Sequence, residues 1–305
     1  MLSAATEQLH PSASGLDERP LEDVAAMLIK AQMAAVATVS AAASEIAKGA
    51  QAMAQTLSEG GVLYYVAAGS SGLMAASDAL ELGGTFSIPA QQLRILMAGG
   101  LPTGVEMPGD TEDECAGLQE GLAELHPGDT VIAVSASGTT PYTLKAVEIA
   151  RNAGAQIIGI ANNPGSALLE AADIPIALPT PPELLCGSTR LGAGTAQKIT
   201  LNTLSTAMAV ALGHVHDGMM VNLRTDNAKL RGRAAGIVSR VASVDPAAAE
   251  AALEVTRGEV KLATLIAAHS VSLHEARARL GRANGRLRAA LARTAPKETK
   301  HGDKT

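Results

Sequence analysis

The sequence predicts a three-layer α/β fold, a parallel β-sheet sandwiched between helices, and three observations lead to this prediction. Short apolar segments alternate with helical segments through the middle of the 305-residue chain. Consecutive parallel strands need a crossover connection, which is right-handed and places a helix over the sheet. Hydrophobic residues make up 47% of the chain and aromatic residues 1%, so the core must be aliphatic.

The N-terminal region, residues 1–60, is expected to combine an arm with helices. Residues 1–20 are rich in Pro and in Ser and other polar residues, which favours an extended arm. Residues 21–58 are Ala-rich and contain no Pro, which is typical of helix, and Gly60 with Gly61 ends the pattern.

The central region, residues 61–240, is expected to hold the sheet. Each predicted strand is a short apolar segment, and helical segments such as 141–153 separate some of them. A long helix is expected over 195–212, ended by Gly213. The predicted strands are 62–68, 93–97, 130–136, 156–161 and 174–178.

The C-terminal region, residues 241–293, is expected to form a small three-helix module. Ala and Leu dominate it, in a pattern that favours short packed helices. The charged residues 294–305 are expected to be a disordered tail. The three predicted helices are 246–257, 259–269 and 272–280.

Composition and charge exclude several classes of function. The formal net charge is −6, so the protein lacks the overall positive charge that attracts nucleic acid. Aromatic residues, on which nucleic-acid bases stack, are scarce. We find no signal peptide and no apolar run of membrane-spanning length, and we therefore expect a cytoplasmic protein. Cys115 and Cys186 lack metal-ligand spacing and fit reduced thiols. We expect no metal, no organic cofactor, and no nucleic-acid or membrane partner.

Hydroxyl residues gather where two predicted strands give way to helices. Ser70, Ser71 and Gly72 follow the first strand, and Ser135, Ser137, Thr139 and Thr140 follow the third. Free N–H groups at helix N-termini and hydroxyl donors suit a phosphate, and the carboxyl edge of an open parallel sheet is where ligands bind. Ser and Thr are also the ordinary helix N-caps, so a purely structural role is the alternative. Neither loop has the glycine pattern of a dinucleotide site or a P-loop, which disfavours a nucleotide.

The same loops resemble a known fold and family. The segments Ala68–Gly72, Asp78–Glu81 and Ser135–Tyr142 resemble the sugar isomerase (SIS) fold, within it the N-acetylmuramic acid 6-phosphate etherases. The resemblance continues through Asn163–Ser166, Gly187–Arg190 and, most specifically, Ala193–Lys198. It covers nearly the whole chain, including Thr6–Gln8 near the start and Asn227–Leu230 further on.

The resemblance implies an enzyme that cleaves the D-lactyl ether of an amino-sugar 6-phosphate by elimination and hydration. Glu81 stands at the position of the acid that protonates the departing lactate oxygen. Glu112 stands at the position of the base that removes the C2 proton. Such chemistry needs two carboxyl groups in opposite protonation states. The resemblance further implies a homodimer and places Glu183, Ser188 and Lys198 among the substrate-binding residues.

Several cationic positions of the etherase pattern are occupied by other residues in this chain. Positive charge is thereby lost around the expected pocket. The hydroxyl residues expected to bind the phosphate are present, whereas the cations expected to bind a second anionic group of the substrate are missing. Two alternatives stay open: a non-catalytic sugar-phosphate sensor of the SIS fold, and a sugar-phosphate isomerase. The substituted positions are Leu9, Ser12, Leu73, Thr139 and Gly192.

Overall fold

The computed structural model describes residues 4–107, 111 and 113–292, and its chain forms two compact units. The first unit ends at Ala211 and the second begins at Leu212. The sequence places the start of the C-terminal module at residue 241, inside a helix that packs within the second unit. The predicted catalytic base, Glu112, lies outside the described residues.

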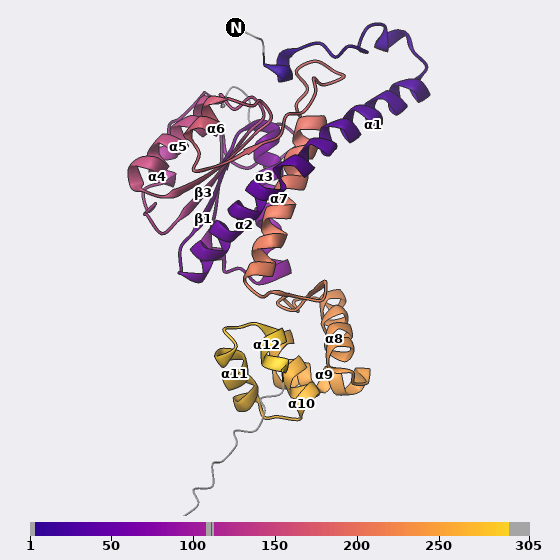
Figure 1. Cartoon of the computed structure of the whole chain (residues 1–305), viewed down its shortest axis with the longest axis vertical. Helices are drawn as coiled ribbons and strands as arrows, with labels where there is room; N and C mark the ends of the chain where they lie inside the picture. The colour runs from indigo at the N-terminus through magenta and orange to yellow at the C-terminus, as the bar shows by residue number, and fades with distance from the viewer. Residues whose placement is uncertain (1–3, 108–110, 112, 293–305) are drawn as a thin grey trace, which may run out of the picture. The chain divides into compact units, whose positions relative to one another are not determined.

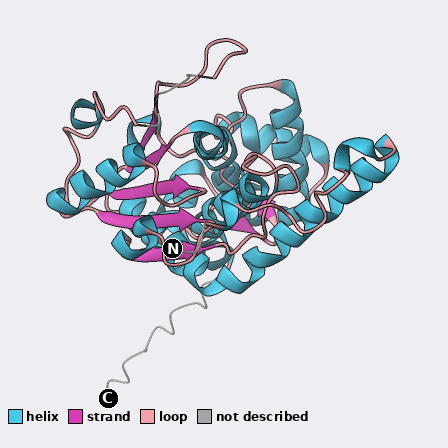
Figure 2. Cartoon of the chain, turned by 90° about the horizontal axis from the view of Figure 1, so that it is seen from above, coloured by secondary structure: helices cyan, strands magenta, loops and turns pink. Residues whose placement is uncertain are grey.

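The first unit contains the predicted parallel sheet. Its five strands run in the order β2-β1-β3-β4-β5, and every neighbouring pair is parallel (Figure 2). The three-layer α/β class is therefore confirmed. The strands are β1 (Leu63–Ala67), β2 (Leu93–Met97), β3 (Thr130–Ser135), β4 (Gln156–Ala161) and β5 (Ile174–Ala177).

Helices cover both faces of the sheet (Figure 1). On one face α2 and α3 contact the strands, α7 packs on both of them, and α1 packs on α7. On the other face α5 and α6 contact the strands, and α4 packs on α5. The helices are α1 (Leu21–Ala37), α2 (Ala43–Ser58), α3 (Gly69–Phe86), α4 (Leu118–Gly121), α5 (Pro141–Ala153), α6 (Ala167–Ala171) and α7 (Gly192–Ala211).

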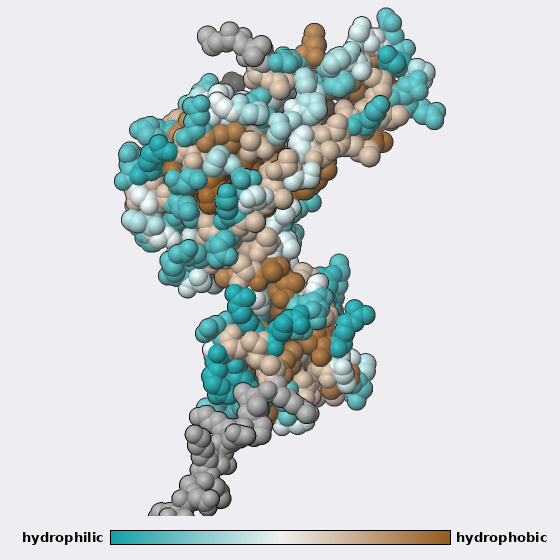
Figure 3. Space-filling model, viewed as in Figure 1, coloured by the Kyte–Doolittle hydropathy of each residue, from teal (hydrophilic) through white to brown (hydrophobic). Residues whose placement is uncertain are grey.

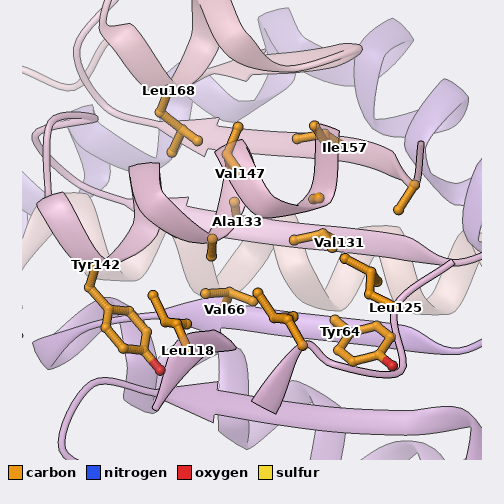
Figure 4. Packing of buried hydrophobic residues seen from close by; sticks show 14 of the residues in the cluster. Tyr64, Val66, Leu118, Leu125, Val131, Ala133, Tyr142, Val147, Ile157 and Leu168 are labelled. Carbon is orange, nitrogen blue, oxygen red and sulfur yellow. The ribbon is translucent and has the colours of Figure 1, made fainter. Parts of the chain in front are cut away.

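The core on the α5 side follows the period-2 alternation of strands. Alternate residues of β1 and β3 point to this face and pack with side chains of α5 (Figure 4). Neighbouring strand residues face α2, α3 and α7, so the strands are buried on both sides. The labelled core residues are Tyr64, Val66, Leu118, Leu125, Val131, Ala133, Tyr142, Val147, Ile157 and Leu168.

A glycine permits the close packing of the other helical layer. A Cβ atom at Gly49 of α2 would lie 2.8 Å from Leu204 Cδ2 and 3.5 Å from Ile158 Cδ1. These two contacts come from α7 and β4. A side chain at position 49 would push α2 away from its neighbours, so Gly49 sets the spacing of this layer.

The second unit is a helical module with a short hairpin. Two strands pair antiparallel, Val215–His216 (β6) and Met219–Met220 (β7). The prediction had three helices, whereas α8 and α12 also contribute buried side chains to the common core, among them Val238 and Leu287. The helices are α8 (Ala228–Ala242), α9 (Pro246–Val255), α10 (Val260–His269), α11 (Leu273–Arg282) and α12 (Leu287–Leu291).

The N-terminal helices leave apolar side chains exposed. Residues 21–58 are helical as expected, with a 3-10 turn, Thr38–Ala42, between α1 and α2. By length and composition this stretch can cross a membrane, contrary to the expectation that no segment is long and apolar enough. The sparse charges of the Ala-rich segment explain the difference. On α1, Leu21, Ile29 and Met33 are more than half exposed, and Figure 3 shows tan and brown side chains along this helix.

Candidate functional site

The strand order creates a topological switch point at the carboxyl edge of the sheet. β1 lies between β2 and β3, so the chain leaves β1 toward one side of the sheet and later enters β3 on the other. In open α/β sheets ligands bind at such a switch point. Ala67 is paired with Val134, so the loops that follow β1 and β3 begin on neighbouring strands. These are the two loops that the sequence predicts to hold a phosphate.

The hydroxyl groups after β3 form a connected network. Ser135 Oγ lies 2.8 Å from Thr140 Oγ1 and 3.3 Å from Ser137 Oγ, and it accepts a hydrogen bond from the Gly138 N–H at 3.0 Å. Ser137 Oγ accepts from the N–H and the hydroxyl of Thr139, at 3.2 and 3.1 Å. The structure thus brings together the four predicted hydroxyl residues of this loop. Hydroxyl groups rotate freely, so the same groups can turn toward an anion.

The turn at Gly138 requires glycine. Its φ of +72° is in the left-handed region, and a Cβ atom there would lie 2.1 Å from Ser166 Oγ. Ser166 is buried, and its Oγ has no hydrogen-bond partner among the described residues. The loop is therefore fixed in its path by contact with the start of α6.

The residues after β1 lie in the first turn of α3. Ser70 is half-buried and Ser71 is buried. Gly72 packs closely, because a Cβ atom there would lie 2.8 Å from Met97 Cγ at the end of β2. Within the described residues, no side chain caps the N-terminus of either α3 or α5. These hydroxyl groups therefore do not act as N-caps. The backbone N–H groups in the first turns of α3 and α5 remain available for an anion.

Three further predicted residues lie on the segment from β5 into α7. The buried Glu183 accepts hydrogen bonds from the N–H groups of Gly192 (2.9 Å) and Ala193 (2.8 Å), so both of its oxygens stabilise the start of α7. Ser188 is half-buried in the preceding turn, and Lys198 is exposed on α7. A Cβ atom at Gly192 would lie 2.9 Å from Ala35 Cβ, which explains the small residue there.

The predicted acid, Glu81, is exposed on α3. It follows Ser70 by eleven residues, a rise of about 16 Å along the helix with a rotation of only about 20°. Glu81 and Ser70 therefore share one stripe of α3. Leu80, which precedes Glu81 and lies about 100° around the helix from it, is 67% exposed, so the surface of α3 near Glu81 is partly apolar.

The same helix carries a buried carboxylate that no local pattern in the sequence marks as a site residue. Asp78 accepts hydrogen bonds from Tyr65 Oη (3.1 Å), Asn202 Nδ2 (2.7 Å) and Ser205 Oγ (2.8 Å). Burial raises the pKa of the Asp78 carboxyl, while these donors and the charge of Lys198 act in the opposite direction. Burial, and next the Asp78 charge, raises the pKa of Tyr65 well above its usual range. Asp78 thus joins α3 to β1 and α7.

A cavity of about 480 Å³ lies at the opposite, amino edge of the sheet, lined in part by Asp129, Arg151 and Asp173. Its aspartates have structural partners: Asp129 accepts from the N–H of Val62 (2.8 Å), and Asp173 from that of Ile157 (2.8 Å). These contacts fix the starts of strands. The switch point and its hydroxyl groups lie at the other edge, which remains the better candidate site.

Comparison with known proteins gives consistent results. Residues 29–162 match the model of the SIS domain. The chain is 44% identical over 290 residues to the N-acetylmuramic acid 6-phosphate etherase of Deinococcus radiodurans, covering 94% of each chain. It is 40% identical over 290 residues to the enzyme of that name from Streptomyces avermitilis, covering 94% of this chain and 93% of the relative.

Solved structures agree on the fold alone. An Escherichia coli CFT073 protein in complex with A5P superposes with a TM-score of 0.50 at 16% identity, covering 65% of this chain and 94% of that one. A Bacteroides fragilis protein assigned to the phosphosugar isomerases gives a TM-score of 0.52 at 19% identity, with coverage of 65% and 95%.

Proposed function

The chain belongs to the N-acetylmuramic acid 6-phosphate etherase family, and we propose that it cleaves the D-lactyl ether of N-acetylmuramic acid 6-phosphate by elimination and hydration. The enzyme is a carbon–oxygen lyase that acts on an amino-sugar 6-phosphate. The relatives of that name at 39–44% identity over nearly the full length carry this assignment.

The substrate's phosphate binds at the carboxyl edge of β1 and β3. The uncapped first turns of α3 and α5 supply amide donors with the positive end of a helix dipole. Hydroxyl groups from Ser70, Ser135 and Ser137 add donors that rotate toward the phosphate oxygens. Lys198 adds a positive charge on α7, and Ser188 a hydroxyl group from the turn before this helix.

The reaction divides between two carboxyl groups. Glu112 removes the proton at C2 of the open-chain sugar, which the C1 aldehyde makes acidic. The C3–O bond then breaks, and Glu81 gives its proton to the departing lactate oxygen. Water adds at C3 of the unsaturated aldehyde while a proton returns to C2. The products are N-acetylglucosamine 6-phosphate and D-lactate.

A second copy of the chain completes the site by covering Glu81. Acid catalysis is most efficient away from bulk water, yet Glu81 is exposed in the single chain. Helix α7 packs between α3 and α1. All three helices carry apolar side chains that are more than half exposed: Leu80 on α3, Val210 on α7, and Ile29 and Met33 on α1. A homodimer through this face buries the apolar side chains and shields Glu81 from water.

The dimer also accounts for the apolar α1 in a cytoplasmic enzyme. The segment of membrane-spanning length is interrupted by the 3-10 turn and carries Glu45 and Lys48 in its second half. A second copy, not lipid, covers α1. Purification without detergent as a dimer supports this assignment, and recovery only in the membrane fraction contradicts it.

Isotope labelling tests the proposed reaction. Purified protein is incubated with N-acetylmuramic acid 6-phosphate in D₂O or in H₂¹⁸O. Elimination and hydration place one deuterium at C2 and the water oxygen at C3 of the sugar product. Hydrolysis at the lactyl carbon places the ¹⁸O in lactate and leaves C2 undeuterated. Absence of D-lactate at micromolar enzyme rejects the etherase and leaves a sensor, whereas aldose–ketose interconversion without D-lactate identifies an isomerase.

A further inference from the structure

One buried asparagine joins the N-terminal arm to the phosphate-binding edge. Asn163, which follows β4 and is 8% exposed, accepts a hydrogen bond from the Ala5 N–H at 2.9 Å. Its Nδ2 donates to Thr6 Oγ1 at 3.2 Å, and Thr6 is itself buried. Both ends of this amide therefore hold the arm, although the partners are nearly 160 residues apart in the sequence.

The same amide group holds the hydroxyl loop. Asn163 Nδ2 also lies 3.3 Å from the carbonyl oxygen of Ala136 and 3.2 Å from that of Ser137. Ser137 is the residue whose hydroxyl accepts both hydrogen bonds from Thr139. The position of the arm and the orientation of this loop therefore depend on one side chain.

The arm also contacts the loop after β5, which carries the predicted substrate-binding residue Ser188. Cys186 Sγ lies 3.5 Å from the carbonyl oxygen of Glu7. Glu7 Oε2 lies 4.0 Å from the position that a Cβ atom of Gly187 would occupy, next to Ser188. Residues 5–7 thus connect the loop after β3 with the loop after β5.

We propose that Asn163 is a positioning residue, which holds residues 5–7 against both loops so that the arm becomes a wall of the sugar-phosphate site. This inference rests on the proposed function for its substrate. Its physical basis is pre-organisation: a loop already held in its binding geometry loses less entropy when the phosphate binds. The proton-transfer groups lie on other segments, so the effect falls on substrate binding rather than on the chemical step.

Four variants test the inference: Asn163→Ala, Thr6→Val, deletion of residues 2–8, and the deletion combined with Asn163→Ala. The matched control is Asn152→Ala, at an exposed asparagine of α5. For each protein, KM and kcat for D-lactate release are measured. Thr6→Val keeps the shape of the side chain but removes one acceptor, so it reports on the contact if a larger change prevents folding.

We expect Asn163→Ala and the deletion each to raise KM about fivefold or more, the effect of roughly one hydrogen bond. We expect kcat to stay within about twofold. The combined variant should be little worse than the deletion alone, because both changes remove the same connection. Thr6→Val should raise KM less, and Asn152→Ala should leave it unchanged.

Two results overturn the inference. One is a deletion variant, or a folded Thr6→Val variant, with unchanged KM. The other is a combined variant whose KM shows the two effects multiplied, which means that Asn163 acts without the arm. If the wild-type protein releases no D-lactate, the proposed function fails separately. The dissociation constant for N-acetylglucosamine 6-phosphate, measured by calorimetry on the same variants, then replaces KM in the comparison.

Discussion

Replacement of the buried Asp78 should destabilise the first unit by an amount that depends on the substitute. In Asp78→Ala, the hydroxyl of Tyr65, the amide of Asn202 and the hydroxyl of Ser205 lose their shared acceptor. Tyr65 and Ser205 are buried, so water replaces the carboxylate poorly.

The contacts of the three donors set the size of this effect. A buried donor left without an acceptor costs about 1–3 kcal/mol. Tyr65 loses its carboxylate partner, whereas Ser205 also lies 3.3 Å from the carbonyl oxygen of Asn202 and Asn202 is only half-buried. We therefore expect Asp78→Ala to lower the free energy of unfolding by about 3–5 kcal/mol. Asp78→Asn keeps an oxygen for two donors and removes a buried charge, so it should lower that free energy by only about 1 kcal/mol.

The pH dependence gives a second, independent readout. Burial raises the folded-state pKa of Asp78 above its unfolded value of 3.8. The stability that this carboxyl contributes is therefore fully present below pH 3.8 and is lost as the pH rises through the raised pKa. Relative to Asp78→Asn, which cannot titrate, the wild-type protein should gain stability as the pH falls from 7 toward 4.

Urea unfolding followed by far-ultraviolet circular dichroism measures both effects, with Ser77→Ala as the control at an exposed neighbour on α3. The transition to analyse is that of the first unit. Equal stability of the Ala and Asn variants refutes the reasoning, because it means that the three donors do not depend on a shared acceptor. A difference between wild type and Asp78→Asn that does not change with pH refutes the assignment of a raised pKa.

Three further predictions concern binding, assembly and the second unit. Ser135→Ala removes the central hydroxyl of the network and should raise the dissociation constant for N-acetylglucosamine 6-phosphate about tenfold in calorimetry; an unchanged constant places the phosphate elsewhere. Leu80→Glu should shift the protein from dimer to monomer in analytical ultracentrifugation and lower its specific activity most at low concentration, whereas an intact dimer rejects the proposed face. Burial lowers the pKa of Lys261 to about 8 from 10.5, so the urea concentration needed to unfold the second unit should increase as the pH rises from 8 to 10. Lys261→Met should abolish this increase, and a Lys261→Met protein that still shows it assigns the effect to another group.

The sheet and most helices of the first unit follow from local patterns. Strand segments such as 130–136 are followed by Ser and Gly, and the observed β3 differs from this prediction by one residue. The helical segment 21–58 is equally clear, although its division by a 3-10 turn was not predicted. These features depend on hydrophobic periodicity and on turn residues, which are local properties of a sequence.

The contacts that organise the site are not local. Asp78 meets Asn202 and Ser205 on a helix more than 120 residues away, and no pattern around Asp78 indicates this. Glu183 was predicted to bind substrate, and the structure shows its two oxygens bonded to amides of α7. Short helices such as α12 were missed because their apolar residues are too few to set a period.

The assignment of Glu81 as the acid that acts on a sugar phosphate bound at the hydroxyl-lined edge is the central claim, and Glu81→Gln tests it most directly. Glutamine keeps the size of the side chain but cannot give a proton to the lactate oxygen. The variant should bind N-acetylglucosamine 6-phosphate with a dissociation constant within about twofold of wild type, while kcat for D-lactate release falls at least about a hundredfold. Undiminished D-lactate release by a correctly folded Glu81→Gln protein would contradict the account.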